Sequence, residues 1–139
     1  MFDRCLYFNI NHLAWVVNRK WDETFKEFGL SSAHAYLLRV VLANPGLTQK
    51  EIGGILLLDK STITRFVNTL EKKKLIKRTS LSDADAREQR VVPSPMALKM
   101  HAAIEQAGQH LYEEMQRRLG KNELQQLVGL ARAASEKLG

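Results

Sequence analysis

The chain has 139 residues and a formal net charge of +6, with 45% hydrophobic and 26% charged residues. This balance is typical of one globular domain, or of a small DNA-sized module with an accessory helical layer, and it excludes a disordered or fibrous protein. No apolar run approaches the roughly 18 to 20 residues that a membrane span needs. The first residues mix charges of both signs, unlike a signal peptide. We therefore expect a cytoplasmic protein with no membrane association.

The positive charge is concentrated in one part of the chain. Residues 60–90 hold nine Lys or Arg against four acids, so this segment carries +5 of the total +6. Such concentration favours contact with a polyanion over a generally basic surface. A solvated lysine-rich helix end would have the same composition, and charge alone leaves both interpretations open.

Helical periodicity dominates the first 46 residues. Apolar side chains from Leu6 to Phe28 advance in steps of three and four, which predicts a long helix with one buried face that ends at Gly29. Ser31 or Ser32 can cap a second helix. The segment 44–46, Asn-Pro-Gly, must stop that helix because proline cannot continue the hydrogen-bond ladder.

Two short helices and two strands follow. Residues 48–51, Thr-Gln-Lys-Glu, form a capping box that starts the first short helix. Asp59 can cap the second, which is expected over residues 60–73. Residues 75–81 and 88–92 have the composition of strands separated by a polar, Asp-rich turn. The order predicts a winged helix-turn-helix.

Two further helices complete the chain. Ser94 followed by Pro95 is a good N-cap and first-turn pair for a helix that ends near Gly120. The last helix carries an apolar stripe from Leu124 to Leu138. The predicted fold class is mainly α-helical with a small β-hairpin wing.

The first turn of the second short helix is rich in hydrogen-bond donors. In a winged helix-turn-helix this helix enters the major groove and presents its first turn to base edges. Ser61 can also serve helix capping alone, whereas Arg65 has no acid at position 61 or 69 to pair with. The predicted base contacts are Lys60, Ser61, Thr62, Thr64 and Arg65.

Other cations in the segment are candidates for groove and phosphate contacts. Arg87 lies near the predicted hairpin tip, where a guanidinium can enter the electronegative minor groove. Asp83 and Asp85 can cap the turn and orient Arg87, although a surface ion pair of little consequence is the alternative. The predicted phosphate contacts are Lys72, Lys73, Lys77, Arg78 and Arg90.

Four segments together resemble the MarR family of bacterial and archaeal transcription regulators. They are residues 47–52, LTQKEI; 58–65, LDKSTITR; 70–78, LEKKKLIKR; and 83–87, DADAR. The resemblance covers nearly the whole chain. It implies a triangular homodimer, held by the first and last two helices, whose winged modules bind a near-palindromic operator in double-stranded DNA. It also implies that small phenolic or aromatic ligands, or cysteine oxidation, often release the DNA.

The resemblance assigns a role to each part of the chain and predicts a homodimeric repressor released by a small-molecule effector. The expected parts are residues 1–30, an N-terminal helix that contributes to dimerisation; 31–93, the winged helix-turn-helix DNA-binding domain; and 94–139, the C-terminal helices of the dimerisation region.

Three residues depart from the family pattern. Leu57 stands where a turn glycine is common, so the turn is strained if it requires a positive φ. Ser94-Pro95 replaces the usual Leu-Thr but supplies its own cap. Glu88 stands where a second wing arginine is common, which lowers the charge available to the minor groove.

The first two helices contain candidate effector residues. His12, Trp15 and Arg19 form a second stripe beside the apolar face, and Tyr36 comes from the next helix. Trp15 could stack on an aromatic ligand while Arg19 or His12 binds its carboxylate. Ordinary core or dimer packing would produce the same pattern.

The single cysteine, Cys5, offers an alternative mechanism of release by peroxide or redox sensing. It sits near the place where peroxide sensors that resemble this family carry a reactive cysteine. The tyrosines that such sensors bring to the thiol are absent, since Arg19 and Ser32 occupy the nearest matching places. A buried, inert thiol is the competing interpretation.

Catalysis has little support in the sequence. The four histidines form no His-x-x-x-His pair, there is no phosphate-cradling glycine loop, and no Ser or Cys lies in a nucleophile motif. A winged module that binds a protein partner is a third class, but it would not need nine cations within residues 60–90. We expect a non-enzymatic regulator that uses no metal and no cofactor.

Overall fold

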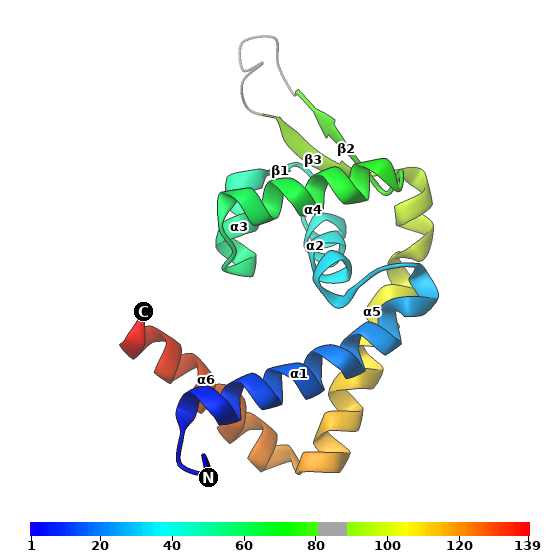
Figure 1. The fold of residues 1–139 in the computed structure, drawn as a ribbon. Helices are drawn as coiled ribbons and strands as arrows, with labels where there is room; N and C mark the ends of the chain where they lie inside the picture. The colour runs from blue at the N-terminus through cyan, green and yellow to red at the C-terminus, as the bar shows by residue number, and fades with distance from the viewer. Residues whose placement is uncertain (81–88) are drawn as a thin grey trace. The chain divides into compact units, whose positions relative to one another are not determined.

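The computed structural model describes residues 1–80 and 89–139 (Figure 1). The elements in chain order are α1 (Leu6–Phe25), a short 3-10 helix η1 (Lys26–Phe28), α2 (Ser32–Ala43), β1 (Leu47–Thr48), α3 (Gln49–Leu56), α4 (Lys60–Lys72), β2 (Ile76–Thr79), β3 (Arg90–Pro93), α5 (Pro95–Leu119) and α6 (Lys121–Leu138). Within these described ranges, no helix is long and apolar enough to cross a membrane. The predicted fold class is confirmed.

The helix starts are set by side-chain caps. Ser31 accepts a hydrogen bond from the backbone N–H of His34, and Thr48 forms a complete capping box with Glu51. Asp59 accepts from the backbone N–H of Thr62. These caps satisfy N–H groups that a helix leaves without partners in its first turn. The local sequence therefore predicts where α2, α3 and α4 begin.

The wing is a three-stranded antiparallel sheet in the order β1-β3-β2. Leu47 lies opposite Val91 in one ladder, and Ile76 lies opposite Pro93 in the other. The sequence does not predict β1, because two residues carry no strand periodicity of their own. β2 and β3 are shorter than the predicted strands over 75–81 and 88–92. The predicted turn with Asp83, Asp85, Arg87 and Glu88 lies outside the described residues.

Two compact units divide the chain, residues 1–105 and residues 106–139. The core of the first unit is formed by Phe25 of α1 and by side chains of α2, α3, α4, the sheet and the first half of α5. Its largest fully buried members include Leu37, Leu38, Ile52, Ile63, Leu70, Ile76, Val91 and Ile104. The second unit contains the rest of α5 and all of α6. The division of roles among residues 1–30, 31–93 and 94–139 stays a prediction.

Helix α1 does not bury the apolar face that its periodicity predicts. Within the single chain Leu6, Ile10, Leu13 and Val17 are all exposed, and Phe25 is the buried residue of the helix. Helix α6 likewise has no buried residue, although Leu127, Val128 and Leu138 belong to its apolar side chains. Both helices therefore present uncovered apolar side chains when each unit is taken by itself.

The turn between α3 and α4 contains the strain that Leu57 predicts. Leu57 has φ 57° and ψ 42°, the left-handed region, and its side chain is 88% exposed. A residue with a Cβ is disfavoured there by about 1–2 kcal/mol. Gly53 allows the turn to close, because a Cβ at this position would lie 3.1 Å from the carbonyl oxygen of Leu58.

Candidate nucleic-acid interface

Helix α4 presents one face to the core and the other to solvent. Ile63, Val67 and Leu70 are buried at helical spacing. Between them, Arg65 and Asn68 are exposed, and Thr64, Phe66 and Thr69 are half-buried. The strongly amphipathic sequence of the helix therefore fixes which face is available to a groove of DNA.

Two of the predicted base-reading residues extend into solvent. Lys60 and Arg65 are exposed. The Arg65 guanidinium carbon lies 5.9 Å from the centre of the Phe66 ring, an arrangement that orients the side chain without using its donors. No ion pair within residues 1–80 and 89–139 involves Lys60 or Arg65. Their charges are available to a polyanion.

The hydroxyl-bearing residues of the same turn already make internal hydrogen bonds. The Ser61 hydroxyl donates at 3.0 Å to Oδ1 of Asp59, which is the residue that caps α4. Thr64 Oγ1 lies 2.9 Å from the carbonyl oxygen of Lys60 and 3.3 Å from Gln49 Oε1 on α3. Thr62 is half-buried, and its backbone N–H donates to Asp59. Base contacts by these three side chains stay predictions.

The cap residue Asp59 is held in its ionised form. Hydrogen bonds from Thr62 and then from Ser61 lower the pKa of the Asp59 carboxyl below its usual value. A charged carboxylate at a helix N-terminus also interacts favourably with the helix dipole. The charged cap therefore stabilises the start of α4 at neutral pH, with Lys60 in the first turn and Arg65 in the second.

The predicted phosphate contacts divide into exposed lysines and internally bonded cations. Lys72 and Lys77 are exposed. Lys73 Nζ donates to the carbonyl oxygen of Gly29 at 3.2 Å, and Arg90 donates to the carbonyl oxygen of Gly46 at 3.0 Å. Arg78 donates to Asn68 and lies 3.9 Å from a Glu71 oxygen. Lys73, Arg78 and Arg90 therefore have structural roles besides any contact with DNA.

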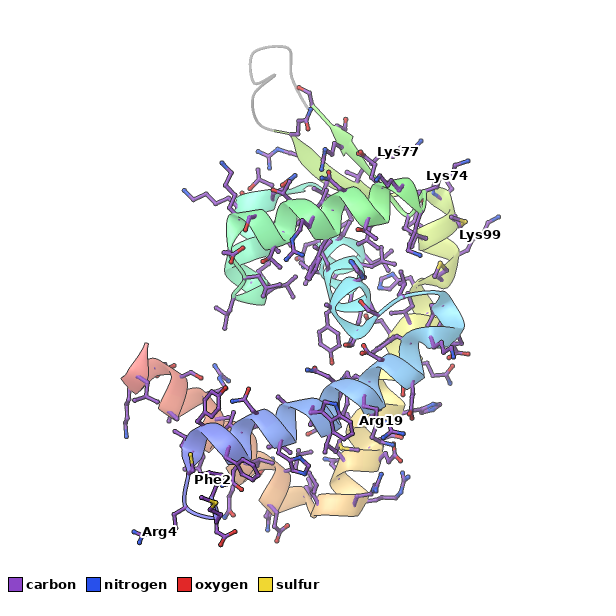
Figure 2. All side chains as sticks on the ribbon, in the orientation of Figure 1. Phe2, Arg4, Arg19, Lys74, Lys77 and Lys99 are labelled. Atoms are coloured by element: carbon purple, nitrogen blue, oxygen red, sulfur yellow. The ribbon has the colours of Figure 1, made fainter. Side chains whose placement is uncertain are left out.

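Two lysines outside the predicted site belong to the same charged end of the module. Lys74 has φ 61° and is exposed, and Lys99 is exposed in the first turns of α5. Figure 2 shows the side chains of Lys74, Lys77 and Lys99 projecting toward the same side of the view. The run of lysines at 72–74 is a sequence signal for Lys74, whereas Lys99 is brought near only by folding.

The predicted effector residues do not share one pocket. Trp15 and Arg19 line a hollow of about 390 Å³, and Tyr36 lines a separate one of about 240 Å³ together with Trp21. His12 stacks on Trp15, with ring centres 6.4 Å apart, but lines neither hollow. Trp21 is a pocket residue that the sequence assigned to the apolar face of α1.

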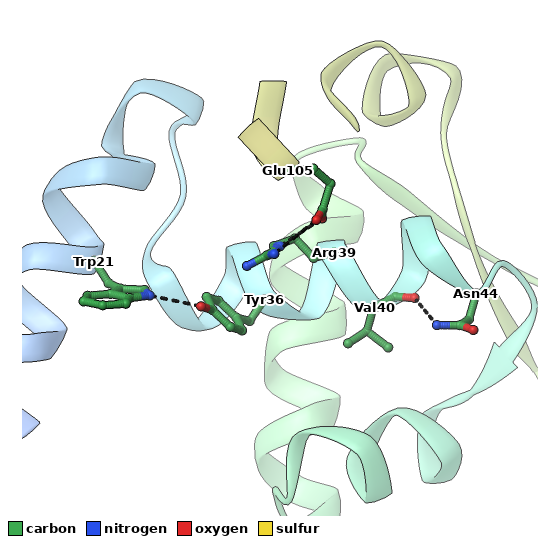
Figure 3. A network of polar contacts seen from close by, with 6 residues as sticks. All are labelled: Trp21, Tyr36, Arg39, Val40, Asn44 and Glu105. Carbon is green, nitrogen blue, oxygen red and sulfur yellow. Dashed lines mark hydrogen bonds and ion pairs between the residues drawn. The ribbon is translucent and has the colours of Figure 1, made fainter. Parts of the chain in front are cut away.

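A chain of polar contacts links α1, α2 and α5 within the first unit (Figure 3). Trp21 Nε1 donates to the Tyr36 hydroxyl at 3.0 Å, and the Arg39 guanidinium lies over the Tyr36 ring. Arg39 also makes two hydrogen bonds to the Glu105 carboxylate, at 2.9 and 3.1 Å. This pairing raises the pKa of Arg39 and lowers the pKa of Glu105.

Comparison with known proteins gives the family. The family model described as MarR family matches residues 28–88. The HTH-type transcriptional regulator YwoH of Bacillus subtilis (strain 168) is 31% identical over 102 residues, which cover 73% of this chain and 73% of that protein. The chain belongs to the MarR family. It is a MarR-family transcriptional regulator, as the sequence motifs predict.

Another relative and a solved structure extend the likeness. A Thauera aromatica protein, named as a transcriptional regulatory protein for the hcr operon, is 35% identical over 94 residues, covering 68% of this chain and 56% of that relative. The fold is similar to that of MepR in the crystal structure of the Staphylococcus aureus MepR-DNA complex, with a TM-score of 0.84, 20% identity and coverage of 96% and 97% of the two chains. The similarity to MepR therefore covers the helices on both sides of the winged module as well as the module itself.

Cys5 and the candidate metal ligands can be placed in this MarR-family chain. Cys5 is half-buried and is the residue before α1, with no side-chain cap bond. Among the residues that the structure describes, no cluster of three His, Cys, Asp or Glu could hold a metal ion. The reactivity of Cys5 stays a prediction.

Proposed function

We propose that this MarR-family regulator is a sequence-specific double-stranded DNA-binding protein that acts as a homodimeric repressor. The observation that carries the proposal is the N-terminal half of α4, where Lys60 and Arg65 are exposed while Ile63 and Val67 are buried, and where Asp59 caps the helix. Arg65 reads base edges in the major groove, because a guanidinium can pair with the two acceptors of a guanine. The structurally similar protein MepR has been crystallised in a complex with DNA.

A second set of residues supplies the salt-dependent part of the affinity. Lys72, Lys77 and Lys74 are exposed and contribute charge to phosphates without internal partners in the described chain. Arg78 joins β2 to Asn68 on α4, Arg90 joins β3 to Gly46, and Lys73 joins the end of α4 to Gly29. Each keeps further N–H groups that add positive charge to the surface. Arg87 is proposed to enter the minor groove and lies outside the described residues.

Homodimer formation is supported by the uncovered helices. Exposed apolar side chains on α1 and α6 are the surface that a second copy would cover. Two winged modules related by two-fold symmetry would then bind a near-palindromic operator. A monomer at micromolar concentration in sedimentation would contradict this mechanism.

Effector binding is proposed at the two hollows beside α1. Trp15 and Arg19 offer a ring and a guanidinium to an aromatic anion, and Trp21 and Tyr36 line the neighbouring hollow. The regulator is proposed to be a cytoplasmic protein that catalyses no reaction and needs no cofactor. The alternative is that Cys5 senses peroxide. If peroxide still releases DNA from the Cys5→Ser variant as it does from the wild type, Cys5 is not the sensor.

Selection of duplexes from a random pool at about 0.15 M salt tests DNA recognition, because salt weakens unspecific phosphate binding. We expect enrichment of a two-fold symmetric site with half-sites about one helical turn apart. Arg65→Ala should lose this preference, while Lys72→Ala should retain it at reduced affinity. Failure of the wild type to enrich any sequence would contradict the proposed sequence-specific reading.

A further inference from the structure

A group of exposed lysines lies beyond the end of α4 that is opposite the proposed base-reading residues. It consists of Lys74 in the turn after α4, Lys77 on β2 and Lys99 on α5, and we call it the lysine patch. Its three side chains project toward the same side of the view in Figure 2, and all belong to the first compact unit. Lys60 begins α4 and Lys72 ends it, about 18 Å apart at 1.5 Å per residue. The lysine patch is therefore distinct from the first turn of α4.

The segments that carry the lysine patch contain no acid. Residues 72–80 and 89–100 hold seven Lys or Arg and neither Asp nor Glu. Glu71, the acid that precedes them, lies 3.9 Å from Arg78. Within the described residues 1–80 and 89–139, no ion pair involves Lys74, Lys77 or Lys99. The three charges are therefore available to an acidic partner.

Lys74 has a backbone conformation that favours glycine. Its φ is 61°, in the left-handed region, where a Cβ lies too close to the following carbonyl oxygen. Its side chain is exposed, so packing in the core does not account for a lysine at this position. A strained, exposed residue of this kind motivates a search for a contact outside the chain.

Ser94 fixes the start of α5 against the turn that carries Lys74. Its backbone N–H donates to the Leu75 carbonyl oxygen at 2.9 Å, and its hydroxyl donates to the Lys74 carbonyl oxygen at 2.7 Å. The same hydroxyl oxygen accepts from the backbone N–H of Ala97, and Ser94 is 5% exposed. The backbone of the lysine patch is thus held in place before a partner arrives, which lowers the entropic cost of binding.

Exposed apolar side chains adjoin Lys99. Met96 is 47% exposed and Leu98 is 53% exposed, both at the start of α5. Met96 precedes Lys99 by three residues, so the two lie on the same side of the helix. Methionine is flexible and is common at surfaces that bind proteins. Phosphate groups offer nothing to Met96 or Leu98, so the combination of cations and apolar side chains favours a protein partner over nucleic acid.

We propose that the lysine patch, together with Met96 and Leu98, binds an acidic segment of a protein partner that also carries apolar side chains. The carboxylates pair with the three lysines, and the apolar side chains lie against Met96 and Leu98. This binding does not depend on the proposed DNA-binding function. Because Lys74 and Lys77 are also proposed phosphate contacts, the bound segment reduces the salt-dependent part of the DNA affinity, and this consequence alone rests on the proposed function.

Binding is tested by titrating the whole protein with a synthetic peptide of repeated Glu-Glu-Leu and following backbone amide NMR signals. We expect the largest shifts at Lys74, Lys77 and Lys99. Repeats of Gln-Gln-Leu and of Glu-Glu-Ser are the matched probes, which lack the charge and the apolar side chain respectively. Each should bind at least about threefold more weakly. Shifts confined to α1 or to the first turn of α4, or equal affinity for Glu-Glu-Leu and either matched probe, would overturn the proposal.

Variants separate the lysine patch from general charge. Lys99→Gln should weaken peptide binding about two- to fivefold, whereas Lys50→Gln, at an exposed lysine of α3, should not. Met96→Ser should also weaken it, with Ile55→Ser as the control at an exposed apolar residue of α3. Lys74→Gly should raise the melting temperature because strain is relieved, and yet weaken peptide binding. Unchanged peptide affinity in Lys74→Gly and Lys99→Gln, with the fold intact by NMR, would overturn the placement.

A duplex of scrambled sequence tests whether the patch is instead a DNA surface. We expect the duplex to shift the amide signals of Lys72 and Lys77 but not those of Met96 and Lys99. If the duplex shifts Met96 and Lys99 as strongly as the peptide does, the surface binds DNA and the proposal is wrong.

The effect on DNA affinity is measured with the same duplex at several salt concentrations. Saturating peptide should reduce the slope of log affinity against log salt by about two, because two phosphate contacts are lost. An unchanged slope would overturn the competition for Lys74 and Lys77. Failure of the proposed DNA-binding function would appear as no duplex binding without peptide, a result that leaves the peptide titration unaffected.

Discussion

The winged module and the helices α1 and α6 have similar amphipathic sequences but different burial. Leu37 and Leu38 on α2 and Ile63 on α4 are at most 1% exposed, whereas Leu13 on α1 is 38% exposed and Leu127 on α6 is 38% exposed. The same helical period thus produces a closed core in one region and an open face in the other. A stripe of apolar residues indicates that one face of a helix packs against another surface, but it does not show whether that surface belongs to the same chain.

The strongest test of this comparison is a truncation inside the winged module. Leu38→Ala should lower the free energy of unfolding by about 2–5 kcal/mol, because it leaves a cavity in a closed core. Urea unfolding followed by circular dichroism measures the change. A cost below roughly 0.5 kcal/mol, within the range of surface substitutions, would contradict the closed core.

The corresponding change in α1 should weaken dimer formation and leave the stability of the winged module unchanged. Leu13→Asp places a charge on each copy of the exposed face, and the dimer should weaken by roughly 3 kcal/mol or more, since two apolar contacts of about 1.5–3 kcal/mol are lost. Sedimentation across protein concentrations measures this. Asn11→Asp changes charge on the same helix and serves as the control. Equal association of Leu13→Asp and wild type would place the dimer interface elsewhere.

The next largest effect distinguishes base recognition by Arg65 from phosphate contact by Lys72, both on α4. Arg65→Ala should cost about 1–3 kcal/mol on the preferred duplex and much less on a scrambled one, if a bidentate base contact is lost. Lys72→Ala should weaken both duplexes alike and reduce the salt dependence. Binding isotherms on the two duplexes make the comparison, and equal losses for Arg65→Ala would remove its base-reading role.

An exposed leucine inside the winged module provides the exception to its closed packing. Leu57→Gly should stabilise the protein by about 0.5–1 kcal/mol, because left-handed strain of about 1–2 kcal/mol is relieved and the greater freedom of unfolded glycine offsets part of it. Thermal and urea unfolding give the sign. Leu57→Ala is the control, since it keeps the Cβ and the strain; a glycine variant no more stable than the alanine variant would refute the strain.

The smallest expected effect concerns the ion pair that joins α2 to α5. Hydrogen bonds from Arg39 lower the pKa of Glu105, so the pair adds stability above the unfolded pKa of Glu and loses it as pH falls through the folded pKa. The Glu105 side chain is 43% exposed, so screening by solvent limits the contribution to about 0.2–1 kcal/mol. Wild type should therefore exceed Glu105→Gln in unfolding free energy at pH 7, with a smaller difference at pH 3. A constant difference would contradict the ionic contribution.

The sequence by itself determined the local features of this protein. Ser31, Thr48 and Asp59 start helices because their side chains satisfy N–H groups a few residues away. Ser94 does so as well, accepting from the backbone N–H of Ala97. The cap and length of α4 were readable from residues 59–73, and the combined motifs were specific enough to indicate the MarR family. Each of these signals acts over a few residues and is therefore readable along the chain.

Only the tertiary structure decided which polar side chains lack an internal partner and where pockets remain. Lys73 and Arg90 each bond a carbonyl 44 residues away, and Thr64 contacts Gln49 across 15 residues. The two-residue strand β1 and the hollow lined by Trp21 and Tyr36 likewise depend on elements brought together from separate segments. The sequence shows which residues carry charges and hydrogen-bond donors. Whether those groups are free to bind a ligand depends on partners that are distant in sequence, because only packing brings such partners within hydrogen-bond reach.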